Sequence, residues 1–276
     1  MKHITLGHTP DADDAFMFFA MATGKVASPM FEIEHVIDDI ETLNTRAINH
    51  ELDITAISVH AYSYVKDYLI LRSGASFGLN YGPRLISKKP LKCQDLTNRV
   101  IAIPGKLTSA NLLLKLLIGN FDGKEMNFSS IPEAISSNSV DAGLVIHEAQ
   151  ISEATQFHTV VDLGKWWHNV TGGMPVPLGI NIASRRSLKI EEIRNFDILF
   201  RKSIEYGLKN MEEALEYSMK YARGTSKDLI RRFVKMYVNE LTVDMGTQGE
   251  RSIGHLLKRG KEQNMLSFDE ILFSTP

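Results

Sequence analysis

Short apolar runs alternate with segments of helical periodicity along most of this chain of 276 residues. In the first part, strand-like runs at 3–8, 31–39 and 53–58 are separated by helical patterns at 15–23 and 40–50. Strands that alternate with helices form a parallel sheet, because each helix returns the chain to the same edge in a right-handed crossover. The alternation therefore predicts an α/β fold.

The same alternation resumes near residue 100, with a strand at 100–103, a helix from about 110 and a buried run at 142–146. A chain of this length exceeds that at which a single core usually keeps growing. We therefore predict a two-lobed solute-binding-protein fold, in which each lobe is a mainly parallel sheet flanked by helices and a ligand cleft lies between the lobes. The large lobe is expected at 1–90 and 177–276, the small lobe at 91–176, and the chain crossings near 84–90 and 176–180.

Composition narrows the functional classes. A net charge of −2 without long runs of one sign gives no reason to expect nucleic acid or an anionic membrane as a partner. No apolar run approaches the roughly 18 residues needed to span a bilayer. The single cysteine, Cys93, excludes an internal disulfide, and the N-terminus lacks the apolar core of a secretory signal, so a cytoplasmic location is expected. A homodimer is left open.

His147 is the leading candidate for chemistry. It follows the buried run at 142–146, together with Glu148, and should lie at the carboxyl end of a strand, where open α/β sheets bind ligands. With an ordinary pKa near 6.5, an imidazole can take up and return a proton at neutral pH. The alternative is a structural histidine held by hydrogen bonds.

Two further segments carry candidate ligand contacts. Ser58 ends the third predicted strand, and Thr108 and Ser109 occupy the N-cap region of the apolar helix near 110. A helix start offers free N–H groups and suits a carboxylate or phosphate. An ordinary capped helix is the alternative, and the absence of a GxxxxGK[ST] pattern argues against nucleotide triphosphate chemistry.

The acidic cluster Asp11, Asp13 and Asp14 precedes the first predicted helix. Carboxylates there accept free backbone N–H groups and oppose the positive end of the helix dipole, which is the favoured interpretation. A metal site with His8 is an alternative, and in a third interpretation Asp14 shapes a substrate-binding loop that includes Thr9.

A set of ordered motifs then identifies a resemblance that runs nearly end to end. The motifs are TPDADDAFMFFA, DDIETLN, TAIS, LRSG, PGKLTSA, GLVIHE, VVDLGKWW, PVPLG and YVNELTVDMGTQGER. In their shared order they resemble the 1,4-dihydroxy-6-naphthoate synthases of the futalosine route to menaquinone.

The resemblance implies a periplasmic-binding-protein-like fold and a cytoplasmic lyase that needs no metal, nucleotide or flavin. Its substrate would be a small-molecule carboxylate, cyclic dehypoxanthine futalosine, which is cleaved to 1,4-dihydroxy-6-naphthoate and a sugar-derived fragment. The catalytic base falls on His147, and the family's substrate contacts fall on Ala56, Ile57, Ser58, Ser109 and Ala110, with Thr108 adjacent. Because position 56 is a small alanine, only a backbone contact could be made there.

Three rival functions remain at this stage. A protein of this fold could capture a small carboxylate without reacting with it, because a fold by itself carries no function. A sibling enzyme resembling chorismate dehydratase is a second rival, although its opening segment differs from the GHTPDADD of this chain. A sensor domain is the third.

Overall fold

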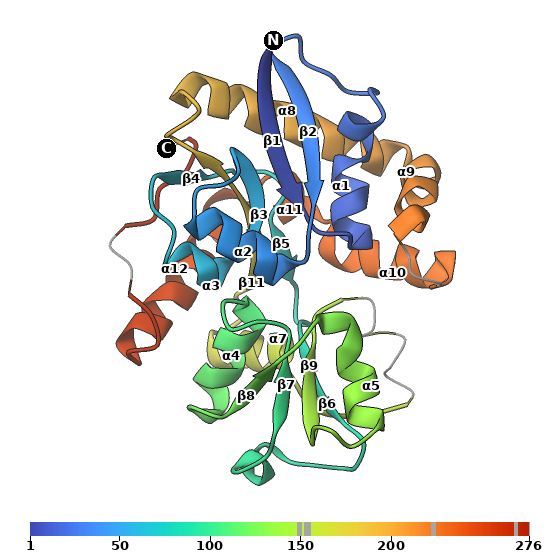
Figure 1. Cartoon of the computed structure of the whole chain (residues 1–276), viewed down its shortest axis with the longest axis vertical. Coiled ribbons are helices and arrows are strands. Elements are labelled where there is room, and N and C mark those ends of the chain that lie inside the picture. Colours follow the sequence, from blue (N-terminus) through green and yellow to red (C-terminus); the bar gives the residue numbers. More distant parts are fainter. Residues whose placement is uncertain (148–150, 152–155, 222–224, 268–269, 276) are drawn as a thin grey trace.

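The computed structural model describes the whole chain except residues 148–150, 152–155, 222–224, 268–269 and 276. It consists of two lobes stacked along the long axis (Figure 1). Both termini belong to the upper, larger lobe, and the lower lobe is built from the middle of the chain. The predicted two-lobed α/β fold is therefore confirmed.

The larger lobe is built on a sheet in the order β2-β1-β3-β11-β4, with β5 also paired to β11. β1 pairs in parallel with both β2 and β3, as the strand and helix alternation predicted. β11 pairs antiparallel with β3, and it also pairs antiparallel with β4 and with β5. The strands are β1 (Lys2–His8), β2 (Phe31–Ile37), β3 (Ile54–Ser58), β4 (Tyr68–Ile70), β5 (Ser76–Gly78) and β11 (Val176–Ser184).

The smaller lobe contains a sheet in the order β10-β6-β9-β7-β8. β9 lies inside this sheet, parallel to β7 and antiparallel to β6, and all four of its residues are buried. The strands are β6 (Arg84–Ser87), β7 (Ile101–Ile103), β8 (Gly123–Glu125), β9 (Ala142–Val145) and β10 (His158–Asp162).

Two details differ from the sequence prediction. Both sheets are mixed rather than mainly parallel, because β11 and β6 each join their sheet antiparallel to a neighbour. In addition, β6 pairs within the smaller sheet, so the first chain crossing precedes residue 84, whereas the predicted boundary assigned 84–90 to the larger lobe. Strand partners are chosen by contacts far apart in the sequence, which a local apolar pattern does not encode.

Helices cover both sheets. In the larger lobe α1 is almost completely buried, because α8, α9 and α10 pack against it, and Phe18 of α1 stacks on Phe200 of α8 at 4.4 Å between ring centroids. The α-helices of the larger lobe are α1 (Ala12–Ala22), α2 (Ile40–Ile48), α3 (Val59–Tyr62), α8 (Ile190–Lys209), α9 (Met211–Ser218), α10 (Lys227–Tyr237), α11 (Glu240–Val243) and α12 (Gly246–Glu262). Those of the smaller lobe are α4 (Ser109–Ile118), α5 (Ile131–Ser136) and α7 (Leu163–Val170). Short 3-10 turns occur at Cys93–Leu96 and Phe128–Ser130 in the smaller lobe and at Met219–Tyr221 after α9 in the larger lobe.

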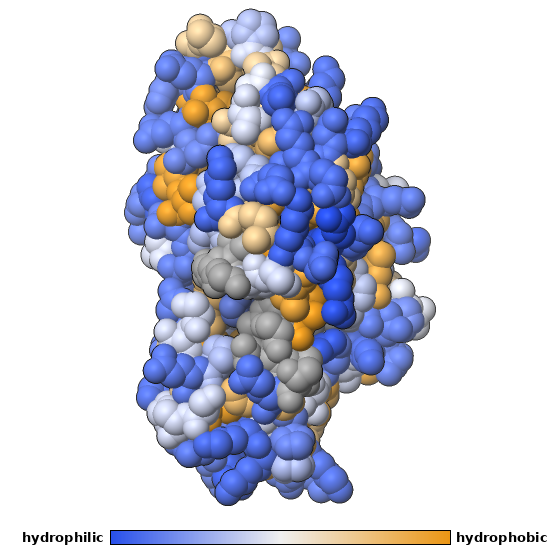
Figure 2. Space-filling view, turned by 90° about the vertical axis from the view of Figure 1, so that its right-hand side faces the viewer, coloured by the Kyte–Doolittle hydropathy of each residue, from blue (hydrophilic) through white to orange (hydrophobic). Residues whose placement is uncertain are grey.

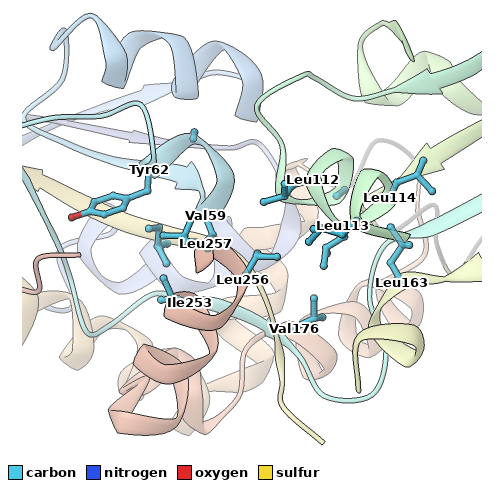
Figure 3. Close-up of a cluster of buried hydrophobic side chains, with 14 of the residues drawn as sticks. Val59, Tyr62, Leu112, Leu113, Leu114, Leu163, Val176, Ile253, Leu256 and Leu257 are labelled. Carbon is cyan, nitrogen blue, oxygen red and sulfur yellow. The ribbon is translucent and has the colours of Figure 1, made fainter. Parts of the chain in front are cut away.

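An apolar cluster joins the lobes at the waist (Figure 3). Helix α4 of the smaller lobe packs against α3, α12 and β11 of the larger one. Leu112 and Leu113 of α4 thus share a buried cluster with Val59 of α3 and Leu256 of α12, and all four are fully buried. This junction core packs the buried face of α4 against the larger lobe.

On the face shown in Figure 2, hydrophobic residues lie in small separate groups among hydrophilic ones. Among the described residues, no helix combines the length and apolar character required to cross a bilayer.

Candidate functional site

A cavity lies where the carboxyl ends of β1 and β3 meet the start of α4. It is bordered by β11 and α10 as well, and the space unfilled by atoms is about 740 Å³, including the part open to solvent. The predicted contacts all border it: Thr9, Asp14, Ala56, Ile57, Ser58, Thr108, Ser109 and Ala110. Residues from both lobes therefore meet around one space.

Three of the four predicted contacts that carry a hydroxyl group donate its proton to the protein itself. Thr9 donates to Asp14 Oδ2 at 2.8 Å, Thr108 donates to the carbonyl of Gly105 at 2.8 Å, and Ser109 donates to the carbonyl of Leu178 at 2.6 Å. Ser58 differs, because its oxygen accepts from Asn44 Nδ2 at 3.3 Å and its backbone N–H donates to Asn44 Oδ1 at 2.8 Å. A hydroxyl group has a single proton to donate. Among these four residues, Ser58 is therefore the one whose hydroxyl proton is not donated in the described hydrogen bonds, so this proton could bind a ligand.

The start of α4 supplies backbone donors. Thr108 is the N-cap residue, and its oxygen accepts from the N–H of Asn111 at 3.3 Å, as a capping side chain should. The first N–H groups of a helix have no partner within the helix. The N–H groups of Ser109 and Ala110 are in this position, and both residues border the cavity. The ordinary capped helix is therefore confirmed, and the anion site, for which these backbone N–H groups would be the donors, stays a prediction.

The acidic cluster lines another part of the cavity. Asp11 occupies the N-cap of α1 without a side-chain capping bond, and Asp13 and Asp14 lie in the first turn. Asp14 accepts from the N–H and the hydroxyl of Thr9, both at 2.8 Å, so it holds the loop after β1 in shape. Burial raises the pKa of Asp14, and the bonds from Thr9 oppose that rise. The pKa of Asp13 is raised well above its ordinary value by burial and then by repulsion from Asp14 and Asp11.

The metal alternative finds no support in this part of the structure. His8 directs its ring nitrogens at the Thr9 carbonyl, 3.1 Å away, and at Nδ1 of His35, 3.2 Å away. Among the described residues, no group of three or more His, Cys, Asp or Glu side chains is arranged to hold a metal ion.

His147 is buried beside the cavity rather than on its border. It follows β9 by two residues, and its neighbour Ile146 borders the cavity. The imidazole packs edge-on against the ring of Phe128, with 4.7 Å between centroids. Glu148, which accompanied it in the sequence interpretation, lies outside the described residues. The predicted strand end is thus found, and the catalytic role of His147 stays a prediction.

Several cavity residues were not identified from the sequence as ligand contacts. Phe233 and Tyr237 of α10 and Asn181 of β11 border the space, and Asn44 lies directly behind Ser58. In the sequence Phe233 belongs to an apolar helical face, which is indistinguishable from a core position. Asn44 lies in the DDIETLN motif, which follows the predicted strand at 31–39. Because open α/β sheets bind ligands at the carboxyl ends of their strands, this position is the one signal in the sequence that could have identified Asn44.

The chain is similar in sequence to known proteins over nearly its whole length. A family model described as menaquinone biosynthesis matches residues 4–262. A protein of Thermus thermophilus named 1,4-dihydroxy-6-naphtoate synthase is 37% identical over 267 residues, which cover 96% of each chain. A protein of the same name from Streptomyces coelicolor is 30% identical over 272 residues, covering 95% of this chain and 94% of its own.

Solved structures give the same picture of the fold. A protein from Archaeoglobus fulgidus superimposes with a TM-score of 0.91 at 44% identity, over 96% of this chain and 98% of that one. An alkanesulfonate-binding protein from Xanthomonas axonopodis pv. citri, only 12% identical, superimposes with a TM-score of 0.71 over 96% and 94% of the two chains. At that identity the likeness shows a shared periplasmic-binding-protein fold alone.

Proposed function

The chain belongs to the menaquinone-biosynthesis family, and on that premise we propose that it is a 1,4-dihydroxy-6-naphthoate synthase. The proposed reaction is the cleavage of cyclic dehypoxanthine futalosine to 1,4-dihydroxy-6-naphthoate and a sugar-derived fragment, a lyase step. The observation that carries the proposal is the convergence of segments 56–58 and 108–110 from different lobes on one cavity. The cytoplasmic location expected from the sequence stays part of this proposal.

The substrate carboxylate is assigned to the start of α4. The N–H groups of Ser109 and Ala110 and the positive end of the helix dipole favour an anion there. The acidic side chains of Asp13 and Asp14 border another part of the same cavity, where they disfavour binding of the substrate carboxylate. This contrast orients the substrate, with its hydroxyl-bearing portion toward Ser58, whose remaining proton suits an oxygen acceptor.

His147 is assigned the role of general base. It would remove a proton from a hydroxyl group, or from the carbon beside the bond that breaks, and aromatisation of the naphthoate ring would drive the cleavage. A general base contributes about 10²- to 10⁴-fold, so the rest of the acceleration must come from orientation and the exclusion of water. Its neighbour Ile146 borders the cavity, so a rotation or small shift of this segment would bring the imidazole to the substrate.

The test mixes purified protein, without added metal or nucleotide, with cyclic dehypoxanthine futalosine and follows naphthoate by mass and absorbance. His147→Ala should lower turnover by about 10²- to 10⁴-fold and leave substrate binding largely unchanged. His158→Ala is the matched control, because that histidine is exposed on β10 of the same sheet. An equal loss of turnover and binding in His147→Ala would refute the base assignment. Substrate that binds and is recovered intact would favour a non-catalytic carboxylate-binding protein.

A further inference from the structure

One side chain of the larger lobe reaches across the waist to the loop that leads into α4. Glu41, in the first turn of α2, accepts the N–H of Leu107 with Oε1 at 2.9 Å and Oε2 at 3.3 Å. Leu107 lies between β7 and α4 of the smaller lobe, and α2 faces this region in Figure 1. The bond therefore links the two lobes two residues before the helix start that borders the cavity.

The same carboxylate is connected to Ser58 on the other side. Asn44 lies three positions after Glu41 and hence on the same face of α2. Its Nδ2 lies 3.0 Å from Glu41 Oε2 and 3.3 Å from Ser58 Oγ, and its Oδ1 accepts the N–H of Ser58 at 2.8 Å. Asn44 is completely buried, so its two bonds to Ser58 are shielded from competing water. Glu41 and Asn44 together form a continuous connection, here called the Glu41–Asn44 bridge.

The loop is shaped to receive Glu41. A Cβ at Gly105 would lie 2.4 Å from Glu41 Cδ and Oε2, so only glycine allows this approach without a shift. The loop is also tied to the first turn of α4, because Thr108 donates to the carbonyl of Gly105 and Asn111 Nδ2 donates to that of Lys106, both at 2.8 Å. A side chain that holds Leu107 therefore holds the helix start as well.

We infer that the Glu41–Asn44 bridge is a positioning device that sets the distance between the Ser58 hydroxyl and the start of α4. Neither Glu41 nor Asn44 borders the cavity, so both act through the groups that do. A ligand held at Ser58 and at α4 touches both lobes, and a misplacement of about 1 Å can lower a rate by about 10²-fold. The consequence for turnover rests on the proposed function, whereas the bridge itself does not.

The experiment measures amide hydrogen exchange and turnover in the full-length protein. In Glu41→Ala, the amide of Leu107 should exchange on the order of tenfold faster or more. The amide of Ser58, which Glu41 does not contact, should also exchange faster, because Asn44 loses one of its fixed partners. Glu41→Gln should restore protection in part, since its amide oxygen can still accept from Leu107. Glu51→Ala is the control, because Glu51 follows α2 but is exposed, and among the described ion pairs it contacts only Arg46.

Turnover provides the second readout. Glu41→Ala should lower kcat by about 10- to 100-fold, with partial recovery in Glu41→Gln and none of this loss in Glu51→Ala. Unchanged exchange at Ser58 in Glu41→Ala would overturn the bridge, and unchanged kcat alongside faster exchange would overturn its positioning role. If the wild type forms no naphthoate, the proposed function fails, and the exchange at Ser58 still decides whether the bridge exists.

Discussion

The close approach of Gly105 to Glu41 allows a quantitative test of the contact between the lobes. In Gly105→Ala the new Cβ would lie 2.4 Å from Glu41 Cδ and Oε2, so the carboxylate must move by about 1 Å to reach an ordinary contact of 3.4 Å. A shift of this size breaks the 2.9 Å bond to Leu107. Hydrogen bonds to a charged group contribute roughly 1.5–3 kcal/mol, and this sets the expected loss.

A double-mutant cycle separates this loss from other effects of the substitution. In a Glu41→Ala background the clash disappears, and Gly105→Ala should stabilise the protein by about 0.4–1 kcal/mol, because alanine restricts the unfolded chain. The difference between the two backgrounds should therefore be a coupling free energy of about 2–4 kcal/mol. Urea unfolding followed by circular dichroism on all four proteins measures it, provided the m-values agree. An equal effect of Gly105→Ala in both backgrounds would refute the contact.

Two further predictions concern the junction core and the acidic cluster. Leu256→Ala should lower the free energy of unfolding by about 2–5 kcal/mol in urea titrations, because Leu256 is fully buried between the lobes; a cost below about 1 kcal/mol would contradict tight packing there. Because the pKa of Asp13 is raised by burial and by its acidic neighbours, the folded state binds its proton more tightly, and stability falls as pH rises from about 4 through the folded pKa. Asp13→Asn should therefore raise stability at neutral pH, on the order of 0.5–2 kcal/mol, and flatten the pH dependence of unfolding; a loss of stability at neutral pH would contradict the argument.

Local signals in the sequence were sufficient for the order of the main elements and for the family. The strand that ends at Ser58 and the helix that starts after Thr108 were both predicted, since apolar periodicity and capping residues are local properties. The family indicated by the ordered motifs is confirmed.

Long-range features were beyond the reach of the sequence. The lobe to which β6 belongs depends on pairing with β9 and β10, which follow it by more than fifty residues. The hydrogen bond between the N–H of Leu107 and Glu41 likewise joins residues 66 positions apart. In the sequence Glu41 is simply an acidic residue in the first turn of a helix, where it is expected for its favourable interaction with the dipole. Its contact with Leu107 becomes visible only once the two sheets are placed.

The hydrogen bonds around the cavity change which groups of Thr108 and Ser109 could bind a ligand. Thr108 and Ser109 were predicted as ligand contacts because of their hydroxyl groups, yet both hydroxyl protons are donated to backbone carbonyls. In the proposed function, anion recognition at α4 would therefore fall to backbone N–H groups, which every residue type other than proline supplies, so an alanine at position 110 could serve. The same reasoning applies to Ala56, where only the backbone is available. Ser58 differs from these positions because its oxygen accepts from Asn44 and its proton is not donated in the described hydrogen bonds. In the proposed function that proton would bind the substrate, so the contribution of Ser58 would depend on the Glu41–Asn44 bridge behind it.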